Sequence, residues 1–146
     1  EYPDLSKATE IAIDLETKDP NIKTKGPGWA TFDGHIVGFA VAAYDQQWYF
    51  PIQHDAGGNM DLGITTAWMQ NILKLPATKI FHNASYDVGW LLVNGFEIKG
   101  KIVDTMIAAA LINENRFSFS LNACAKDYLG EIKNETFLNK KVKICS

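Results

Sequence analysis

Apolar and polar positions alternate strictly in the first predicted strand of the chain, residues 9–17. Positions 11, 13 and 15 are Ile, Ile and Leu, and a strand places them on one face. Asp14 and Glu16 fall on the opposite face, together with Ala12. The pattern predicts a strand with one side in the core and a pair of carboxylates on the other side.

The next part of the chain predicts a hairpin after a long loop. Residues 18–34 are rich in Gly, Pro and Lys, which is typical of a loop. Residues 35–44 and 47–52 are mostly apolar, and Asp45–Gln46 near their junction indicates a turn. We therefore expect two antiparallel strands here.

Helical periodicity and short apolar runs follow each other in the rest of the chain. Helical spacing places four residues on one stripe, Ile64, Trp68, Ile72 and Leu75. A later helix is expected to point Val88, Leu91 and Leu92 inward. The predicted elements are a helix at 64–75, a strand at 77–83, a helix at 85–95, a strand at 99–105 and helices at 105–115 and 120–130.

This order of elements predicts an α/β fold with a mixed five-stranded sheet. An antiparallel hairpin would lie beside parallel βα units, with helices flanking the sheet. The arrangement resembles the ribonuclease H-like architecture. A length of 146 residues suits a single domain over 1–146.

Composition narrows the function classes. A net charge of −3 argues against a protein that binds duplex DNA through many phosphates, but it is compatible with an enzyme that meets phosphate through metal ions. The chain has no run of about 18 apolar residues, so we expect no membrane partner. Cys124 and Cys145 lack metal-like spacing, which fits free thiols in a reducing, cytoplasmic setting.

Asp14 and Glu16 are the first candidate functional residues. Residues at i and i+2 of a strand lie about 6.5–7 Å apart and point the same way. Two carboxylates placed like this repel each other, and their oxygens suit hard divalent cations. A structural alternative stays open, because strand ends often carry acids that face water.

A second candidate group lies at residues 80–91. Asn83 ends a short predicted strand, and Asp87 lies in the first turn of the helix that follows. Both residues also have a structural interpretation, because an acid in a first turn is stabilised by the helix dipole and an Asn before a helix can cap it. Tyr86 and Trp90 have an alternative as core aromatics.

Together the two groups resemble the motifs of the DEDD superfamily of 3′→5′ exonucleases. "IAIDLET" at 11–17 is similar to the first motif, and "FHNASYDVGWL" at 81–91 is similar to the second. The resemblance is to the proofreading domains of family A (polymerase I-type) DNA polymerases, including those of bacteriophages. It extends over residues 10 to about 136.

The resemblance implies a site for two divalent metal ions, Mg²⁺ or Mn²⁺, about 3.5–4 Å apart. Asp14 would bridge both ions, and Glu16 would bind the ion that activates water. Asp87 would support the other ion through water. Asp104 matches a further shared position, which we interpret as a helix N-cap.

The same resemblance implies contacts to a single-stranded DNA 3′ end. Thr17 would hold the terminal nucleotide through its backbone N–H, and Asn83 and Tyr86 match positions that contact the strand. Single strands are usually bound by stacking and phosphate contacts, for which the 18–34 loop offers Trp29, Phe32, Lys18, Lys23 and Lys25. In the alternative, the two aromatic side chains fold onto the core and the lysines are only solvated.

The family's third motif, Y-x-x-x-D on a final helix, is absent, because no Tyr is followed four residues later by an acid. We therefore expect an exonuclease fold that is truncated at its C-terminus and lacks one metal-binding carboxylate. The missing helix would expose apolar sheet surface, which predicts a dimer through the truncated edge or a partner chain. The expected partner is a DNA polymerase domain on the same or another chain.

The predicted function is 3′-5′ exonuclease (proofreading) hydrolysis of phosphodiesters at a DNA 3′ end, slow or inactive in this chain because the third motif is missing. The alternative is a non-catalytic module that keeps the fold and binds single strands or a polymerase. An RNA exonuclease of the same superfamily is a third interpretation, since sugar choice is not legible from these residues.

Overall fold

The computed structural model describes residues 1–130. The predicted truncation and Cys145 concern residues 131–146 and lie outside the described residues. In the described part the elements are β1 (Glu10–Lys18), α1 (Ile22–Lys25), α2 (Gly28–Thr31), β2 (His35–Ala43), β3 (Gln46–Pro51), α3 (Leu62–Lys74), β4 (Thr78–Phe81), α4 (Ala84–Val93), β5 (Ile102–Asp104), α5 (Thr105–Ile112) and α6 (Leu121–Leu129).

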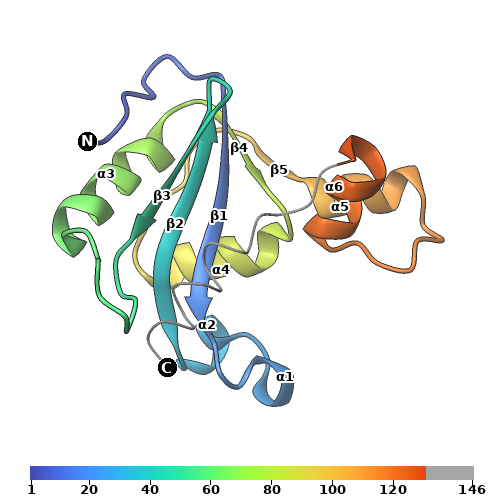
Figure 1. The fold of residues 1–146 in the computed structure, drawn as a ribbon, viewed down its shortest axis with the longest axis horizontal. Coiled ribbons are helices and arrows are strands. Elements are labelled where there is room, and N and C mark those ends of the chain that lie inside the picture. Colours follow the sequence, from blue (N-terminus) through green and yellow to red (C-terminus); the bar gives the residue numbers. More distant parts are fainter. Residues whose placement is uncertain (131–146) are drawn as a thin grey trace. The chain divides into compact units, whose positions relative to one another are not determined.

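The five strands form one sheet in the order β3-β2-β1-β4-β5. β1 pairs with β2 in antiparallel fashion, and β2 does the same with β3, whereas β1 and β4 run parallel. The chain thus reaches β1 first and builds a hairpin on one side and βα units on the other (Figure 1). This confirms the predicted mixed sheet.

One core covers one face of the sheet. Ile11, Ile13 and Leu15 of β1 are buried in a single cluster with residues of β2, β3, α3 and α4. Because strand side chains alternate, Asp14 and Glu16 lie on the opposite face of β1. We call this second face of β1, β2 and β3 the acid face.

The pairing of β1 with β2 is regular up to Glu16 and then shifts. Glu16 pairs with Gly38 and Thr17 with Ile36, so that Val37 is an extra residue on β2. The Val37 carbonyl accepts hydrogen bonds from the backbone N–H groups of residues 52 and 53 at 2.9 and 3.2 Å. The irregularity therefore lies on β2 and leaves β1 in its alternation.

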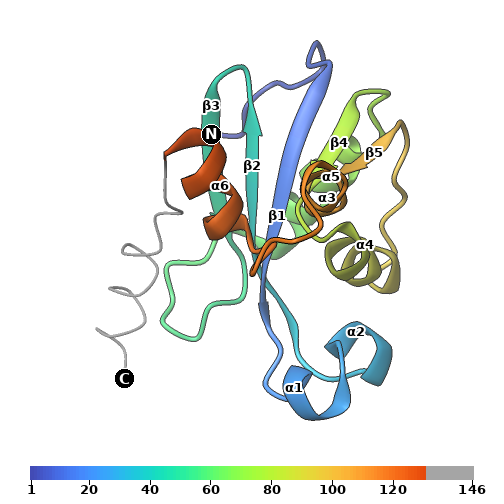
Figure 2. The ribbon, with the colours of Figure 1, turned by 90° about the vertical axis from the view of Figure 1, so that its right-hand side faces the viewer.

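Residues 18–34 are not the plain loop that was predicted. They contain α1 and α2, each one turn long, at the C-terminal end of β1 in both views (Figure 2). The backbone N–H of Gly28 donates to Asp19 Oδ2 at 2.9 Å, and Asp33 N donates to the Gly28 carbonyl at 3.0 Å. The glycine content of this segment indicated a loop, but local hydrogen bonds fold part of it into two short helices.

Three details of the predicted elements were wrong. The hairpin turn is Tyr44–Asp45, both at positive φ, so Gln46 already belongs to β3. In α3 the buried stripe includes Thr65 and Met69, and Ile64 is 60% exposed, because the Thr65 hydroxyl bonds the Tyr2 hydroxyl at 2.7 Å beneath the helix.

One residue of the predicted inward face of α4 was also wrong. Trp90 and Leu91 are buried, whereas Leu92 is 57% exposed. The predicted stop at Asn94–Gly95 is confirmed, with Asn94 as the C-cap and Gly95 at φ 84°.

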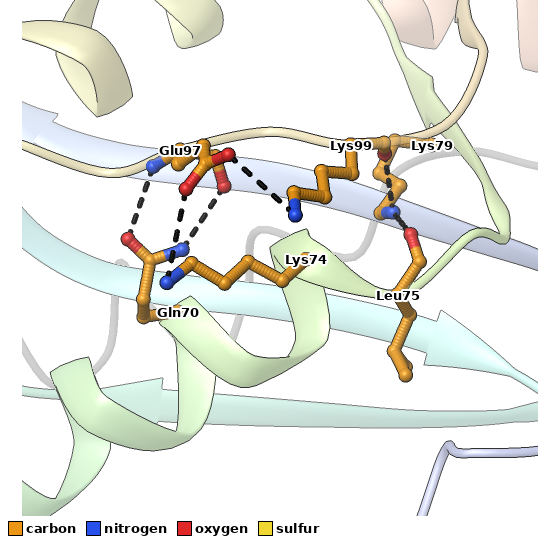
Figure 3. Close-up of polar contacts among 6 residues, drawn as sticks. All are labelled: Gln70, Lys74, Leu75, Lys79, Glu97 and Lys99. Atoms are coloured by element: carbon orange, nitrogen blue, oxygen red, sulfur yellow. Dashed lines mark hydrogen bonds and ion pairs between the residues drawn. The ribbon is translucent and has the colours of Figure 1, made fainter.

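A buried lysine ties the segment before β5 to the rest of the sheet. Lys79 of β4 is fully buried, and its Nζ donates to the carbonyls of Leu75 and Lys99 (Figure 3). Burial lowers the pKa of the Lys79 ammonium from its ordinary value. Beside it, Gln70 and Glu97 exchange two hydrogen bonds of 3.0 Å. These contacts hold residues 95–101 against α3.

Contacts divide the described residues into two units, Glu1–Val103 and the residues from Asp104 onward. In the second unit Asp104 is the N-cap of α5 and accepts from Met106 N at 2.9 Å, which confirms its predicted capping role. Arg116 pairs with Asp127 at 2.8 Å and lies over the Tyr128 ring. The prediction of one domain over 1–146 stays a prediction.

Candidate active site

The two acids of β1 lie on the acid face, opposite small residues of β2. Asp14 pairs with Ala40 and Glu16 with Gly38 on β2. Both partners have a small side chain or none, so the neighbouring strand offers little bulk beside the carboxylates. Asp14 and Glu16 are half-buried, as the alternation predicted.

Asp87 reaches the same stretch of β1 from α4. Its side chain is 3% exposed, and its Oδ2 accepts a hydrogen bond from Leu15 N at 3.3 Å. Leu15 is the residue between the two acids of β1. The structure therefore brings the acid of the second predicted group to the backbone that carries the first. The helix dipole also favours Asp87, since it lies in the first turn of α4.

These three carboxylates give the site its chemistry. Carboxylate oxygens are the ligands that hard divalent cations such as Mg²⁺ prefer. Two of the acids also affect a neighbouring tyrosine: burial raises the pKa of the Tyr49 hydroxyl, and the charges of Glu16 and Asp14 raise it further. Within residues 1–130, no three His, Cys, Asp or Glu side chains form a ready metal-binding group. The metal-binding roles of the acids therefore stay predictions.

Thr17 and Tyr86, predicted to contact the substrate strand, contact each other. Their hydroxyls lie 2.8 Å apart, and the Tyr86 hydroxyl also donates to Asp19 Oδ2 at 2.8 Å. Burial raises the pKa of Tyr86. Sequence reasoning missed Asp19, and the signal for it was an acid that ends a strand before a glycine-rich turn. The Tyr86 hydroxyl thus joins α4 to the end of β1 and to α2.

Asn83 lies between β4 and α4 in the left-handed conformation, with φ 65° and ψ 61°. It takes the N-cap position, but its side chain makes no capping hydrogen bond to the helix. Ser85 Oγ donates to Asn83 Oδ1 at 3.2 Å. The alternative that Asn83 caps α4 through its side chain is therefore wrong, and its predicted contact with a substrate strand stays a prediction.

The aromatic residues of the 18–34 segment separate into two kinds. The Trp29 ring lies so close to Gly89 of α4 that a Cβ there would overlap it, so Trp29 packs against the fold. Phe32 is 89% exposed at φ 57°. Lys18 pairs with Asp55 at 2.8 Å on the surface. Phe32 is thus the aromatic side chain of this segment that is open to a ligand.

Comparison with known proteins gives a family match over nearly the whole chain. A family model described as 3′-5′ exonuclease matches residues 3–145, a longer span than the resemblance predicted from the sequence. A DNA-directed DNA polymerase of Pseudomonas phage M6 is 33% identical over 147 aligned residues, which cover 93% of this chain and 22% of the phage protein. The chain spans about a fifth of the length of the phage polymerases that it matches.

Solved structures share the fold at low sequence identity. NrnC of Brucella melitensis with bound Mg²⁺ matches with a TM-score of 0.63 and 19% identity, over 90% of this chain and 59% of that one. Pol1 from M. smegmatis, in complex with DNA primer-template and dNTP, matches with a TM-score of 0.63 and 20% identity, over 87% of this chain and 20% of that one. These matches confirm the predicted ribonuclease H-like fold. No helix among residues 1–130 is long and apolar enough to span a bilayer.

Proposed function

The chain belongs to the 3′-5′ exonuclease family, and on that premise we propose that it hydrolyses phosphodiester bonds at the 3′ end of a single DNA strand, as a proofreading domain does. The observation that carries this proposal is the hydrogen bond from Leu15 N to Asp87 Oδ2. It brings an acid from α4 to the strand segment that holds Asp14 and Glu16. Asp14 and Glu16 point away from the hydrophobic core, which lies on the other face of β1.

Asp14, Glu16 and Asp87 are the residues that would hold the divalent ions. When bound, two such ions activate a water molecule and stabilise the leaving 3′ oxygen. In the reaction the water oxygen bonds to phosphorus and the bond from phosphorus to the 3′ oxygen breaks. The products are a nucleoside 5′-monophosphate and a strand with a new 3′ hydroxyl. The three carboxylates and the phosphate are all negatively charged and repel each other, so the carboxylates would bind the cations rather than the phosphate.

Residues around the acids would position the strand. Thr17 offers its backbone N–H beside Glu16, and Asn83 lies in the loop that leads into α4. Tyr86 would support the strand contact indirectly, because its hydroxyl forms hydrogen bonds with Thr17 and Asp19 and holds them in place. Phe32, exposed at the end of α2, would stack on an unpaired base. We propose a polymerase domain, on the same or another chain, as the partner that delivers the strand.

Cleavage of a 5′-labelled single-stranded oligonucleotide in Mg²⁺ or Mn²⁺ tests the proposal. Shortening from the 3′ end, with release of nucleoside 5′-monophosphates, is expected for the wild-type chain. Asp14→Ala should lower the rate by at least about 100-fold, since it removes charge at the reacting centre. Glu10→Ala is the matched control, because Glu10 lies on the same face of β1 but is exposed at its start.

Two results would contradict the proposal. Activity that is equal in wild type and Asp14→Ala would come from another protein in the preparation. Tight binding of the oligonucleotide without any cleavage would instead indicate the non-catalytic module.

A further inference from the structure

A tyrosine and a histidine border the acid face, and neither has a role in the proposal above. Tyr49 of β3 pairs with Ala40 of β2, which in turn pairs with Asp14 of β1. Paired residues of neighbouring strands have their side chains on the same side of a sheet. The Tyr49 side chain therefore projects from the face that carries the acids.

The Tyr49 ring leans toward Glu16 across a glycine. Gly38 is the β2 partner of Glu16, and a Cβ on Gly38 would overlap the hydroxyl and the Cζ atom of Tyr49. The end of the phenol thus occupies the space that any other residue at position 38 would fill. This places the Tyr49 hydroxyl beside Glu16, although Tyr49 itself lies in register with Asp14, two residues earlier on β1.

His54 holds the other side of this hydroxyl. Its Nε2 lies 2.5 Å from Tyr49 Oη, and the two rings meet edge to face with centroids 5.9 Å apart. The histidine backbone is fixed in turn by Asn59, whose Oδ1 accepts from His54 N at 2.8 Å and whose Nδ2 donates to His54 O at 2.9 Å. His54 and Asn59, in the loop after β3, therefore set the direction of the Tyr49 hydroxyl.

We propose that Tyr49 and His54 are positioning residues for the Glu16 carboxylate. In this proposal His54 donates its Nε2–H to Tyr49 Oη, which leaves the Tyr49 O–H to be donated to Glu16. The inference rests on the proposed function, because Glu16 needs a fixed orientation only if it binds a cation. Groups that hydrogen-bond a metal ligand from behind orient it and raise metal affinity.

Electrostatics supports this direction of the bonds. An ionised carboxylate can only accept hydrogen bonds, so a hydroxyl that lies beside Glu16 takes the donor role. A hydroxyl donor beside two like charges also reduces their mutual repulsion. Tyr49 thus prepares the carboxylate pair before any ion arrives.

Titration of the 146-residue chain with Mn²⁺, followed by electron paramagnetic resonance, tests the inference. Tyr49→Phe keeps the ring over Gly38 and removes only the hydroxyl, so it should weaken Mn²⁺ binding by about tenfold. His54→Leu should act in the same direction. Tyr44→Phe is the matched control, because Tyr44 lies exposed in the hairpin turn, and it should leave binding unchanged.

A double-mutant cycle separates positioning from a general structural defect. In a Glu16→Gln background, Tyr49→Phe should cause no further loss, since the residue through which Tyr49 acts is already changed. In the metal-free chain, Tyr49→Phe should also shift the ¹³C resonance of the Glu16 carboxyl carbon. A similar loss of Mn²⁺ affinity in both backgrounds, or an unchanged Glu16 resonance, would overturn the inference.

The same titration distinguishes failure of the inference from failure of the proposed function. If Asp14→Ala abolishes Mn²⁺ binding but Tyr49→Phe binds as wild type, the inference alone is overturned. If wild type and Asp14→Ala bind equally, the acids hold no ion and both proposals fall.

Discussion

The carboxylate of Asp87 accepts the backbone N–H of Leu15 across 72 residues of sequence. Leu15 turns its side chain into the core, while its amide lies between two acids of the opposite face. One hydrogen bond therefore joins α4 to β1 at the point where the proposed chemistry takes place. Asp87 thus has a structural role, the bond to the Leu15 amide, and a proposed role in cation binding. Substitutions at this position can separate the two roles.

Asp87→Asn should keep the fold and lose the cation. The amide oxygen can still accept from Leu15 N, but it carries no charge to offer an ion. We expect the free energy of unfolding to stay within about 1 kcal/mol of wild type, while Mn²⁺ affinity falls at least about tenfold. Asp87→Ala, which leaves the Leu15 amide unpaired, should cost about 1–3 kcal/mol. Urea unfolding and Mn²⁺ titration measure both, and an equal loss of stability in the two variants would contradict this division.

Gly89→Ala should detach Trp29 from α4. The added Cβ would overlap the indole ring, because three atoms of the ring would lie within 2.7 Å of it. Overpacking of this kind typically costs about 1–3 kcal/mol. Gly63→Ala in α3 is the matched control, because its Cβ would meet only Asp61 at 3.4 Å, and it should stabilise the helix by about 0.5–1 kcal/mol. Thermal unfolding followed by tryptophan fluorescence measures the change in stability of both variants. Stabilisation by Gly89→Ala would contradict the close contact between Gly89 and the Trp29 ring.

Phe32→Gly should raise stability and weaken DNA binding at once. Phe32 is at φ 57°, a conformation that costs a side chain about 1–2 kcal/mol, and its exposed ring has little packing to lose. Stacking on a base is worth about 1–3 kcal/mol, so affinity for a single-stranded oligonucleotide should fall by about tenfold. Tyr44→Gly relieves the same kind of strain at φ 54° in the hairpin turn and should leave binding intact. Melting curves and fluorescence anisotropy decide, and equal DNA affinity in Phe32→Gly would remove Phe32 from the binding site.

Lys79 should make stability rise with pH in the alkaline range. Its pKa in the folded chain lies below the ordinary value of 10.5, so between these two values the unfolded chain binds more protons than the folded one. The free energy of unfolding then increases as pH rises through that interval. Lys79→Met should remove this increase and leave two carbonyls without their donor.

Denaturant unfolding of wild type and Lys79→Met at several pH values below 10.5 measures the difference in slope. Lys74→Met, at an exposed lysine 3.8 Å from Glu97, should keep the wild-type slope and change stability by less than about 1 kcal/mol. Parallel pH profiles for wild type and Lys79→Met would show that Lys79 does not titrate differently in the folded chain.

Local signals predicted the parts of the fold that depend on local physics. The alternation in β1 placed Asp14 and Glu16 on the correct face, since a strand leaves no other choice. The cap at Asp104 depends on a side chain only two residues before the backbone N–H that it accepts, so it could also be predicted. The approach of Asp87 to β1 agrees with the expected gathering of the acids, although its hydrogen bond was not foreseen.

Contacts between distant residues explain what the sequence did not reveal. Thr65 lies on the buried side of α3, where its hydroxyl bonds the hydroxyl of Tyr2, a residue 63 positions away. Asp19 holds Gly28 and Tyr86 through bonds that no spacing rule encodes. The Tyr49–His54 pair became visible only when the register set Gly38 opposite Glu16.

Val37, the extra residue on β2, takes up the register shift between β1 and β2. Because the shift lies on β2, the side chains of β1 keep their alternation up to Glu16. Insertions or deletions between Lys18 and His35 would then alter the segment of α1 and α2 and leave the register of Asp14 and Glu16 unchanged. On the proposed function, such changes would alter the contact of Phe32 with a strand end and leave Asp14 and Glu16 in place.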